Sequence, residues 1–403
     1  MRQRSRPRAF RALGRAAAML AALAPVVACI AEPIPSPSPS PLVVPGIEVS
    51  PLGEIHGDYV FVLAVKPPPT GPEEGEIWAA PLDGGTAKRV VRWTARAIGG
   101  YGVHQGFGVL ARQLSSDGRR LVIPAPPSLL GPARLGGGLA VVDLVTGAAR
   151  VVSSPDGPDS FRPAWSPDGT RIAFDRYANT FWIGISVMNA DGTGLHPLCD
   201  AGFAPDRSGF AGCYGVDGWT SDGRGVRFYE IGGYAVIDVE TRTITRFDQA
   251  GTSMVAASWR ARRPQLVGAF FDRAEQRIVV ADADSPAPLA IARRATGGGA
   301  FFEARWNPLD DRVLFREQTG AGDRLLVTVL GGAASPVQAG GCPVRGEWHP
   351  AGDAVVFISA CPGAAPTVRT VGLDRQGSDR SVFTPPADGR GLRLIDLAVV
   401  RYR

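Results

Sequence analysis

The chain has 403 residues, of which 45% are hydrophobic and 20% charged, which is ordinary for a globular protein and enough for two average domains or one large repeat domain. Its formal charge of +5 comes from the amino terminus, where six arginines lie within the first fifteen residues and no acidic residue precedes Glu32. If the chain is cleaved before Cys29, those arginines are lost, and 37 basic residues remain against 38 acidic ones. This near-neutral remainder argues against a polyanion-binding protein, and we expect no nucleic-acid partner.

Residues 1–28 are predicted to be a lipoprotein signal peptide. The arginine-rich start is followed by thirteen apolar residues, 16–28, which as a helix would rise about 20 Å, too little for a bilayer core of about 30 Å. The segment ending in Cys29, Val-Val-Ala-Cys, resembles the bacterial lipobox, in which small residues precede a lipidated cysteine. The resemblance implies export and a membrane anchor through lipid on Cys29, on the extracytoplasmic face at the cell surface or in the periplasm. The alternative is an ordinary secretory signal with a chance cysteine.

Residues 29–49 are predicted to be a tether. Residues 33–45 are rich in proline and serine, favour polyproline II and cannot pack a core. We expect them to hold a folded domain, residues 50–403, away from the membrane.

The organising signal of that domain is a repeat, clearest over residues 161–198. Two β-forming runs flank the turn Trp165-Ser-Pro167-Asp168-Gly169, in which proline presets φ, aspartate bonds locally and glycine takes the left-handed conformation. A second hairpin follows around Asp191, so one unit contains four strands. We interpret these Asp-Gly pairs as turns and not as calcium sites, because one aspartate offers few of the oxygens that calcium needs.

The unit recurs along the domain with decreasing fidelity. Trp219 precedes a second Asp-Gly turn at Asp222 and Gly223, and the motif tryptophans from Trp165 onward lie 54, 40, 47 and 42 residues apart. The remaining motif tryptophans are Trp259, Trp306 and Trp348. Repeats of four strands at this spacing predict an all-β fold, a β-propeller of seven four-stranded blades, with six or eight blades as alternatives.

The C-terminal segment 392–402 is a predicted strand without a blade of its own. A propeller must close its ring or leave an exposed edge. We therefore expect this strand to pair with strands near residues 47–64 and to join the two ends of the domain.

The recurrent Trp-Ser-Pro-Asp-Gly pattern resembles the TolB-like, WD-type propellers of periplasmic and surface proteins. The resemblance covers roughly residues 50–400 and implies the propeller fold and a protein partner in the cell envelope. We interpret the tryptophans as large rings wedged between neighbouring blades; ligand stacking is the alternative.

Four cysteines remain once Cys29 is assigned to lipid. An even number in an exported protein suggests disulfides, and three pairings are open. We favour pairing within a repeat or at its edge, which gives Cys199–Cys213 and Cys342–Cys361.

No catalytic motif, metal-binding pattern or cofactor fingerprint is recognised, so we assign no catalytic residue, metal or cofactor. The four histidines are scattered singly, at His56, His104, His196 and His349. They come from different units and could converge only in a central channel. His349 occupies a turn position where other units have serine or asparagine, which favours a turn role for it.

Three functions remain open, the third being a sensory or solute-binding domain, which the sequence does not separate from the first. The first is a membrane-anchored binding or scaffold protein, monomeric, that uses its propeller to contact an unidentified envelope protein; the irregular insertions 96–108, 124–138 and 201–218 are natural contact regions. The second is a carbohydrate-active lyase or hydrolase with its site in the central channel. The resemblance alone does not decide between them.

Overall fold

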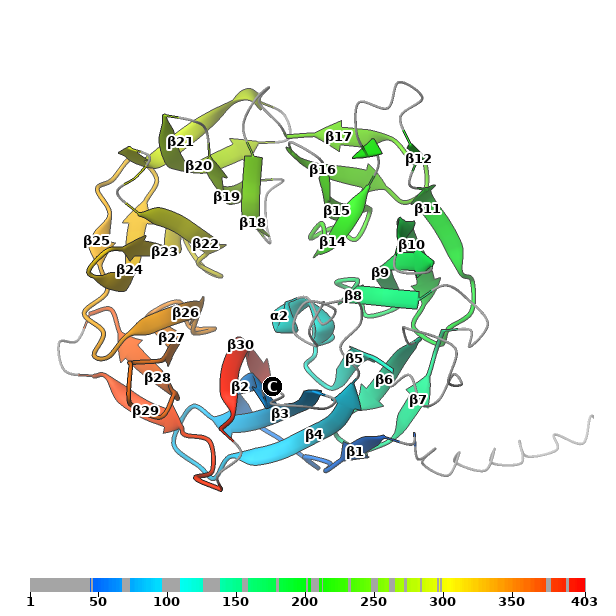
Figure 1. Ribbon diagram of the computed structural model, residues 1–403, viewed down its shortest axis with the longest axis horizontal. Coiled ribbons are helices and arrows are strands. Elements are labelled where there is room, and N and C mark those ends of the chain that lie inside the picture. Colours follow the sequence, from blue (N-terminus) through cyan, green and yellow to red (C-terminus); the bar gives the residue numbers. More distant parts are fainter. Residues whose placement is uncertain are drawn as a thin grey trace, which may run out of the picture. The chain divides into compact units, whose positions relative to one another are not determined.

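The computed structural model describes residue 44 and residues 46–402, except 67–72, 96–108, 126–137, 154–158, 179–180, 201, 204–209, 212, 231–232, 248–252, 261–264, 272–273, 283–284, 296, 298, 375–377 and 389–390. Within this part, seven β-sheets stand around one axis as the blades of a propeller (Figure 1). The prediction of seven blades is confirmed, and the alternatives of six and eight are wrong. Cys29, the predicted signal peptide and most of the predicted tether lie outside the described residues.

Five blades are four-stranded antiparallel sheets, with strands in chain order from the axis to the rim. Blade 3 consists of β8 (Asp159–Trp165), β9 (Arg171–Ala178), β10 (Phe181–Asn189) and β11 (His196–Asp200). Blade 4 consists of β14 (Tyr214–Trp219), β15 (Gly225–Glu230), β16 (Gly233–Asp238) and β17 (Ile244–Arg246). Blade 5 consists of β18 (Ser253–Trp259), β19 (Gln265–Phe271), β20 (Glu275–Asp282) and β21 (Ser285–Ala295). Blade 6 consists of β22 (Ala300–Trp306), β23 (Arg312–Thr319), β24 (Gly322–Val329) and β25 (Ser335–Pro336), and blade 7 of β26 (Pro343–Trp348), β27 (Ala354–Ser359), β28 (Thr367–Gly372) and β29 (Arg380–Phe383).

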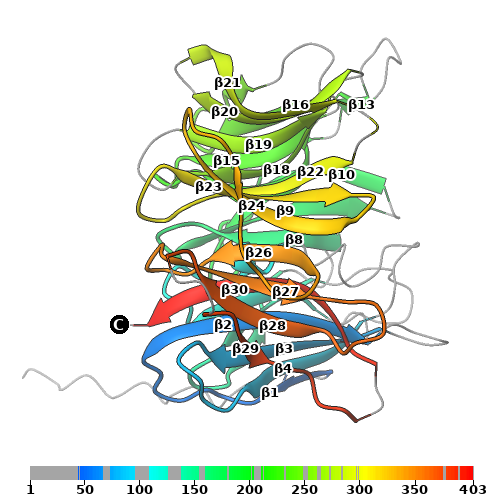
Figure 2. The same ribbon diagram turned by 90° about the vertical axis from the view of Figure 1, so that its left-hand side faces the viewer.

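Blade 1 is built from both ends of the domain. Its inner strand is β30 (Arg393–Tyr402), followed outward by β2 (Gly57–Lys66), β3 (Glu73–Pro81), β4 (Lys88–Ala95) and a fifth strand, β1 (Ile47–Val49). The register of β30 on β2 runs from Gly57 opposite Tyr402 to Val65 opposite Arg393. Figure 2 shows β30, in red, alongside β2, in blue. The prediction that the C-terminal strand joins the two ends of the domain is confirmed.

Blade 2 departs from the four-stranded pattern at the axis. Its sheet contains β5 (Arg120–Pro124), β6 (Leu139–Asp143) and β7 (Ala149–Val151). The inner position is taken by the one-turn helix α2 (Leu110–Gln113) and by a single bridge between Leu114 and Leu121. Leu110 and Leu114 are buried in the apolar core that blades 1 and 2 share, which fixes the helix beside the sheet. No helix of the described residues is long and apolar enough to cross a membrane.

Two disulfides tie segments near the blades together. Cys199 on β11 is joined to Cys213, immediately before β14, so this bond links blades 3 and 4 and encloses the short hairpin of β12 (Gly202–Phe203) and β13 (Phe210–Ala211). Cys342 is joined to Cys361 within blade 7. These are the pairings expected from the repeat boundaries. Closing such loops reduces the entropy of the unfolded chain and fits an oxidising compartment.

Candidate functional site: the central channel and its mouth

A single turn of helix lies in the middle of the ring, where Figure 1 shows α2 among the inner strands. The Leu110 amide donates a 2.8 Å hydrogen bond to Asp396 Oδ2 on β30. Arg112, two residues later, forms an ion pair with Asp217 on β14. The helix α2 therefore links blade 1 to blade 4 across the channel.

Asp217 is fully buried, and both of its carboxylate oxygens are occupied. Tyr229 donates to Oδ1 at 2.9 Å and Tyr234 donates to Oδ2 at 2.5 Å, while Arg112 supplies the compensating charge. Burial is the main cause that raises the pKa of both phenols well above the usual value. The phenols therefore stay protonated and serve as donors, and Asp217 acts as an anchor for α2.

Blades 6 and 7 carry complementary charges just before their motif tryptophans. Blade 6 has Glu303-Ala-Arg305 before Trp306, and blade 7 has the reverse order, Arg345-Gly-Glu347, before Trp348. Arg305 Nε donates to Glu347 Oε1 at 2.7 Å, and Arg345 Nη1 donates to Glu303 Oε1 at 3.3 Å. The charged side chains of the two neighbouring inner strands thus form ion pairs across the blade boundary.

The same charged network continues into blade 1. Arg345 also forms an ion pair with Asp396, the residue that holds the first amide of α2. Arg305 is deeply buried, which lowers its pKa, but the Glu347 and Glu303 charges outweigh burial and keep that pKa above the usual value. These side chains remain charged and hold one another in place.

β-Bulges interrupt the inner strands of two blades. The register of the inner strands shifts between Phe161 and Ala164 in blade 3 and between Phe302 and Arg305 in blade 6. The bulged residues Arg162 and Glu303 have φ of 48° and 54°, in the left-handed region that side chains other than glycine rarely adopt. Strained residues that a fold retains cluster at functional sites, so the channel is the candidate site.

A hollow of about 830 Å³ opens at one mouth of this channel. The turns that follow β22 and β26 form one wall, with Pro308 and Leu309 from blade 6 and Pro350 from blade 7. The opposite wall comes from residues 398–402 of β30 and from the end of α2 with the turn that follows it. Glu347 also lines the hollow, so the hollow reaches the charged network. Its size falls within the usual range of ligand pockets, about 300–1,000 Å³.

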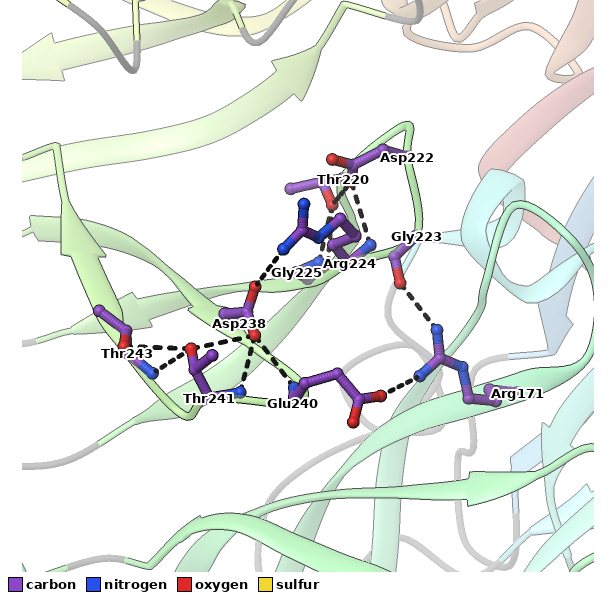
Figure 3. A network of polar contacts seen from close by, with 10 residues as sticks. All are labelled: Arg171, Thr220, Asp222, Gly223, Arg224, Gly225, Asp238, Glu240, Thr241 and Thr243. Atoms are coloured by element: carbon purple, nitrogen blue, oxygen red, sulfur yellow. Dashed lines mark hydrogen bonds and ion pairs between the residues drawn. The ribbon is translucent and has the colours of Figure 1, made fainter. Parts of the chain in front are cut away.

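The repeat motif forms a latch between neighbouring blades. The guanidinium of Arg171, from blade 3, lies 4.9 Å from the ring centroid of Trp219 in blade 4. Arg171 also donates a 2.8 Å hydrogen bond to Gly223 O, which Figure 3 shows. Trp219 Nε1 in turn donates to Ala164 O of blade 3 at 3.0 Å. Arg120 makes the same contacts with Trp165 and Gly169, and Arg312 with Trp348 and Gly352.

The turn inside each motif is locked by its own side chains. Ser166 Oγ donates to Asp168 Oδ1 at 2.5 Å and accepts the Arg171 amide at 2.9 Å, and Asp168 accepts the Thr170 amide. Pro167 lies within this turn, and Gly169 has φ of 68°. Thr220, Asp222 and Gly225 repeat the lock in blade 4, as Figure 3 shows. These aspartates are occupied by turn contacts.

The motif tryptophans lie at the boundaries between blades. Four are 5–7% exposed: Trp165, Trp219, Trp306 and Trp348. Trp259 is only partly buried and packs edge-on against Phe247. Its neighbour Arg260 stacks on Trp306 of the next blade.

The structure does not bring the described histidines together. His349 Nδ1 accepts the Ala351 amide inside its turn, and His349 Nε2 lies 3.3 Å from Asp58 Oδ2 of blade 1. His196 lies on the outer strand β11, His56 lies before β2, and His104 is outside the described residues. Among the described residues, no group of three or more His, Cys, Asp or Glu side chains could hold a metal ion.

Asp175 of β9 is a second buried carboxylate, at the boundary between blades 3 and 4. Its Oδ1 accepts the Val216 amide of β14 at 2.9 Å, while Oδ2 has no hydrogen-bond partner in the part of the chain that the structure describes. Burial raises the pKa of Asp175 from 3.8 to about 6, although Arg162 and the Val216 amide oppose the shift. Asp175 therefore gains a proton more easily in the folded chain than in the unfolded one.

The charged residues of the channel were not predicted from the sequence. Their one sign in the sequence is the opposite order of acid and arginine in the tripeptides before Trp306 and Trp348. The meaning of that order depends on the two inner strands being neighbours in matching register.

No family model matches the sequence, and no curated protein sequence matches it. Among solved structures, a prolyl endopeptidase aligns with 12% identity and a TM-score of 0.53 over 84% of this chain and 50% of that chain. An oligogalacturonate lyase in complex with manganese aligns with 10% identity and a TM-score of 0.53 over 82% of this chain and 86% of that chain. TolB from Acinetobacter baumannii aligns with 14% identity and a TM-score of 0.45 over 85% of this chain and 82% of that chain. The chain spans only half the length of the endopeptidase, and identities this low show the fold alone.

The Arg171 latch predicts a measurable loss of stability. Arg171→Gln removes the stacking on Trp219 and the charged hydrogen bond to Gly223 O, so we expect the free energy of unfolding to fall by about 1–3 kcal/mol. Arg224→Gln is the matched control, because that side chain is 76% exposed and makes one 3.9 Å contact with Asp238. Urea unfolding of both variants gives the comparison, and equal midpoints would exclude a stabilising latch.

Asp175 predicts a pH-dependent component of stability. Because its folded pKa of about 6 exceeds the value of 3.8, this component is fully present below pH 3.8 and is lost as pH rises through 6. The difference between the two pKa values corresponds to roughly 3 kcal/mol in the free energy of unfolding. Asp175→Asn should remove it, so that the variant gains stability relative to the wild type between pH 4 and pH 7.

Urea unfolding at four pH values across this window measures the effect. Asp374→Asn, at an exposed position, is the control and should follow the wild type. Parallel stability curves for the wild type and Asp175→Asn would show that the Asp175 carboxyl does not carry the effect.

Proposed function

We propose that this chain is an extracytoplasmic binding protein, held at the membrane through lipid on Cys29, whose propeller docks an envelope protein at the mouth of its channel. The observation that carries the proposal is the hollow of about 830 Å³, which combines apolar walls with access to charged side chains. Leu309, at its wall, is 57% exposed, so this apolar side chain is available to a docked partner.

The charges of the channel favour binding over catalysis. The carboxylates of Asp217 and Asp396 are held by arginines and by hydrogen-bond donors, and Glu303 is held by Arg345. A general base needs a carboxylate that can reach a substrate proton. Ion pairs that hold each other instead give a rigid floor on which a partner can dock.

A second candidate is a carbohydrate-active lyase or hydrolase with its site in the channel. One observation favours it: Glu347 lines the hollow and pairs with Arg305 through only one carboxylate oxygen. Depolymerisation of oligogalacturonate by the wild type, lost in Glu347→Gln, would favour this candidate. No turnover by the wild type would favour docking.

Docking at the hollow predicts position-specific crosslinking. A photo-crosslinking side chain at Leu309 should capture a discrete envelope protein in cells that express the chain. Ala321 is the matched control, because it is exposed and lies at the other end of β23, about 25 Å away at 3.3 Å per residue. The same products from both positions, or none from Leu309, would contradict docking at this mouth.

The anchor predicts a separate result. Cys29→Ala removes the acceptor for the lipid, and several acyl chains are needed for stable anchoring. We expect the wild type in the detergent-soluble membrane fraction and the variant outside it. An unchanged membrane fraction for Cys29→Ala would show that the lipobox resemblance is misleading.

A further inference from the structure

We infer that the hollow receives a cationic side chain, a lysine or arginine of the docked protein, with Glu347 as its acceptor. This inference rests on the proposed docking function and names the chemistry of the partner. Glu347 lines the hollow, and its side chain is 16% exposed. Arg305 Nε occupies its Oε1 at 2.7 Å, and Glu347 Oε2 has no hydrogen-bond donor among the described residues.

Glu347 belongs to a charge cluster that links blades 6, 7 and 1. Arg305 pairs with Glu347, and Arg345 pairs with Glu303 and Asp396. Arg316 pairs with Asp323 toward the other end of blade 6 and lies 3.9 Å from Glu303. Around Arg305 and Arg345, two positive groups thus face three carboxylates, and a cation that enters the hollow beside Glu347 would balance this cluster.

A second carboxylate oxygen in the network supports the imbalance. Glu303 Oε2 is buried and has no hydrogen-bond partner among the described residues, although Glu303 Oε1 lies 3.3 Å from Arg345 and 3.9 Å from Arg316. A buried carboxylate oxygen without a donor is costly. Additional positive charge near the network would therefore be stabilising.

The walls of the hollow fit the stem of such a side chain. Leu309, Pro308 and Pro350 give an apolar surface above Glu347. Lysine and arginine pack their methylene groups on apolar surface while the charged end finds a polar partner. A small cation without a stem would leave this surface unused.

The basic residues of the rim do not reverse the charge. Arg401 donates to both oxygens of Asp58, at 2.8 and 2.9 Å. Arg119 lies at the rim beside Asp117, whose carboxylate accepts the Arg119 amide. The two rim arginines are thus matched in number by Asp58 and Asp117, and Glu347 is a further carboxylate that lines the hollow.

The test uses two peptides as probes, acetyl-Ala-Pro-Leu-Arg-Leu-Pro-amide and the same peptide with citrulline in place of arginine. Citrulline keeps the shape and removes the charge. Calorimetric titration of the full mature chain should show the arginine peptide binding about tenfold more tightly. Equal affinities for the two peptides, or no binding of either, would overturn the inference.

Variants locate the effect. Glu347→Gln should bring the arginine peptide to the affinity of the citrulline peptide, and its amide oxygen can still accept from Arg305. Glu54→Gln, at an exposed position elsewhere, should behave as the wild type. Leu309→Ser should weaken both peptides equally, and because Leu309 is exposed this variant remains informative if Glu347→Gln unfolds. A Glu347→Gln chain that folds and still prefers the arginine peptide would place the acceptor elsewhere.

The failure of this inference differs from the failure of docking. If Leu309 crosslinks an envelope protein equally well in the Glu347→Gln background, docking stands and the cationic anchor is wrong. If the wild type prefers the arginine peptide but Leu309 captures no envelope protein, the cation site stands and the docking function is wrong.

Discussion

The candidate site depends on the pairing of the C-terminal strand β30 with β2. That pairing puts residues separated by more than 300 positions into one sheet, from Gly57 opposite Tyr402 to Val65 opposite Arg393. It also places Asp396 in the channel, where this residue holds α2 and Arg345 together. The last residues of the same strand form one wall of the hollow. The hollow is therefore complete only when this strand closes the ring. A long-range contact of this kind forms at a high entropic cost and needs local support around the ring.

That support comes from the latches between blades. An arginine of one blade covers the tryptophan of the next and bonds to the carbonyl of its glycine, as Arg171 does with Trp219 and Gly223. At the boundary between blades 1 and 2 a tyrosine takes the place of the arginine. Tyr402, on the C-terminal strand of blade 1, donates a hydrogen bond from its hydroxyl to Gly118 O at 2.8 Å. Gly225 occupies the position of the latching arginine in blade 4, so the boundary with blade 5 lacks this contact from blade 4. Trp259, at that boundary, is accordingly less buried than the other motif tryptophans.

The sequence was sufficient for the features that arise within a repeat. Tryptophan spacing predicted seven blades, and the tail at residues 392–402 predicted ring closure, because each depends on strand length, turn chemistry and the cost of a free edge. It was insufficient where one blade meets another. The segment Leu110–Gln113 is too short to show a helical period, so nothing predicted that α2 replaces an inner strand. The charges of Glu303, Arg305, Arg345 and Glu347 resemble surface residues until the register of neighbouring strands brings them together.

The channel network combines two demands that usually conflict. Ion pairs such as Arg305–Glu347 align adjacent blades, but buried charges are costly to desolvate unless their remaining atoms are also bonded. At Asp217 the chain meets that cost fully, with two phenols and an arginine around one carboxylate. Within the described part of the chain, Glu303 Oε2 has no donor, and Glu347, which lines the hollow, is bonded through Oε1 alone. The carboxylate of blade 4 is therefore fully bonded, whereas the carboxylates of blades 6 and 7 can still accept a hydrogen bond. An incoming positive charge would complete the same pairing that aligns the blades, so recognition at the mouth and rigidity of the ring would depend on one set of side chains.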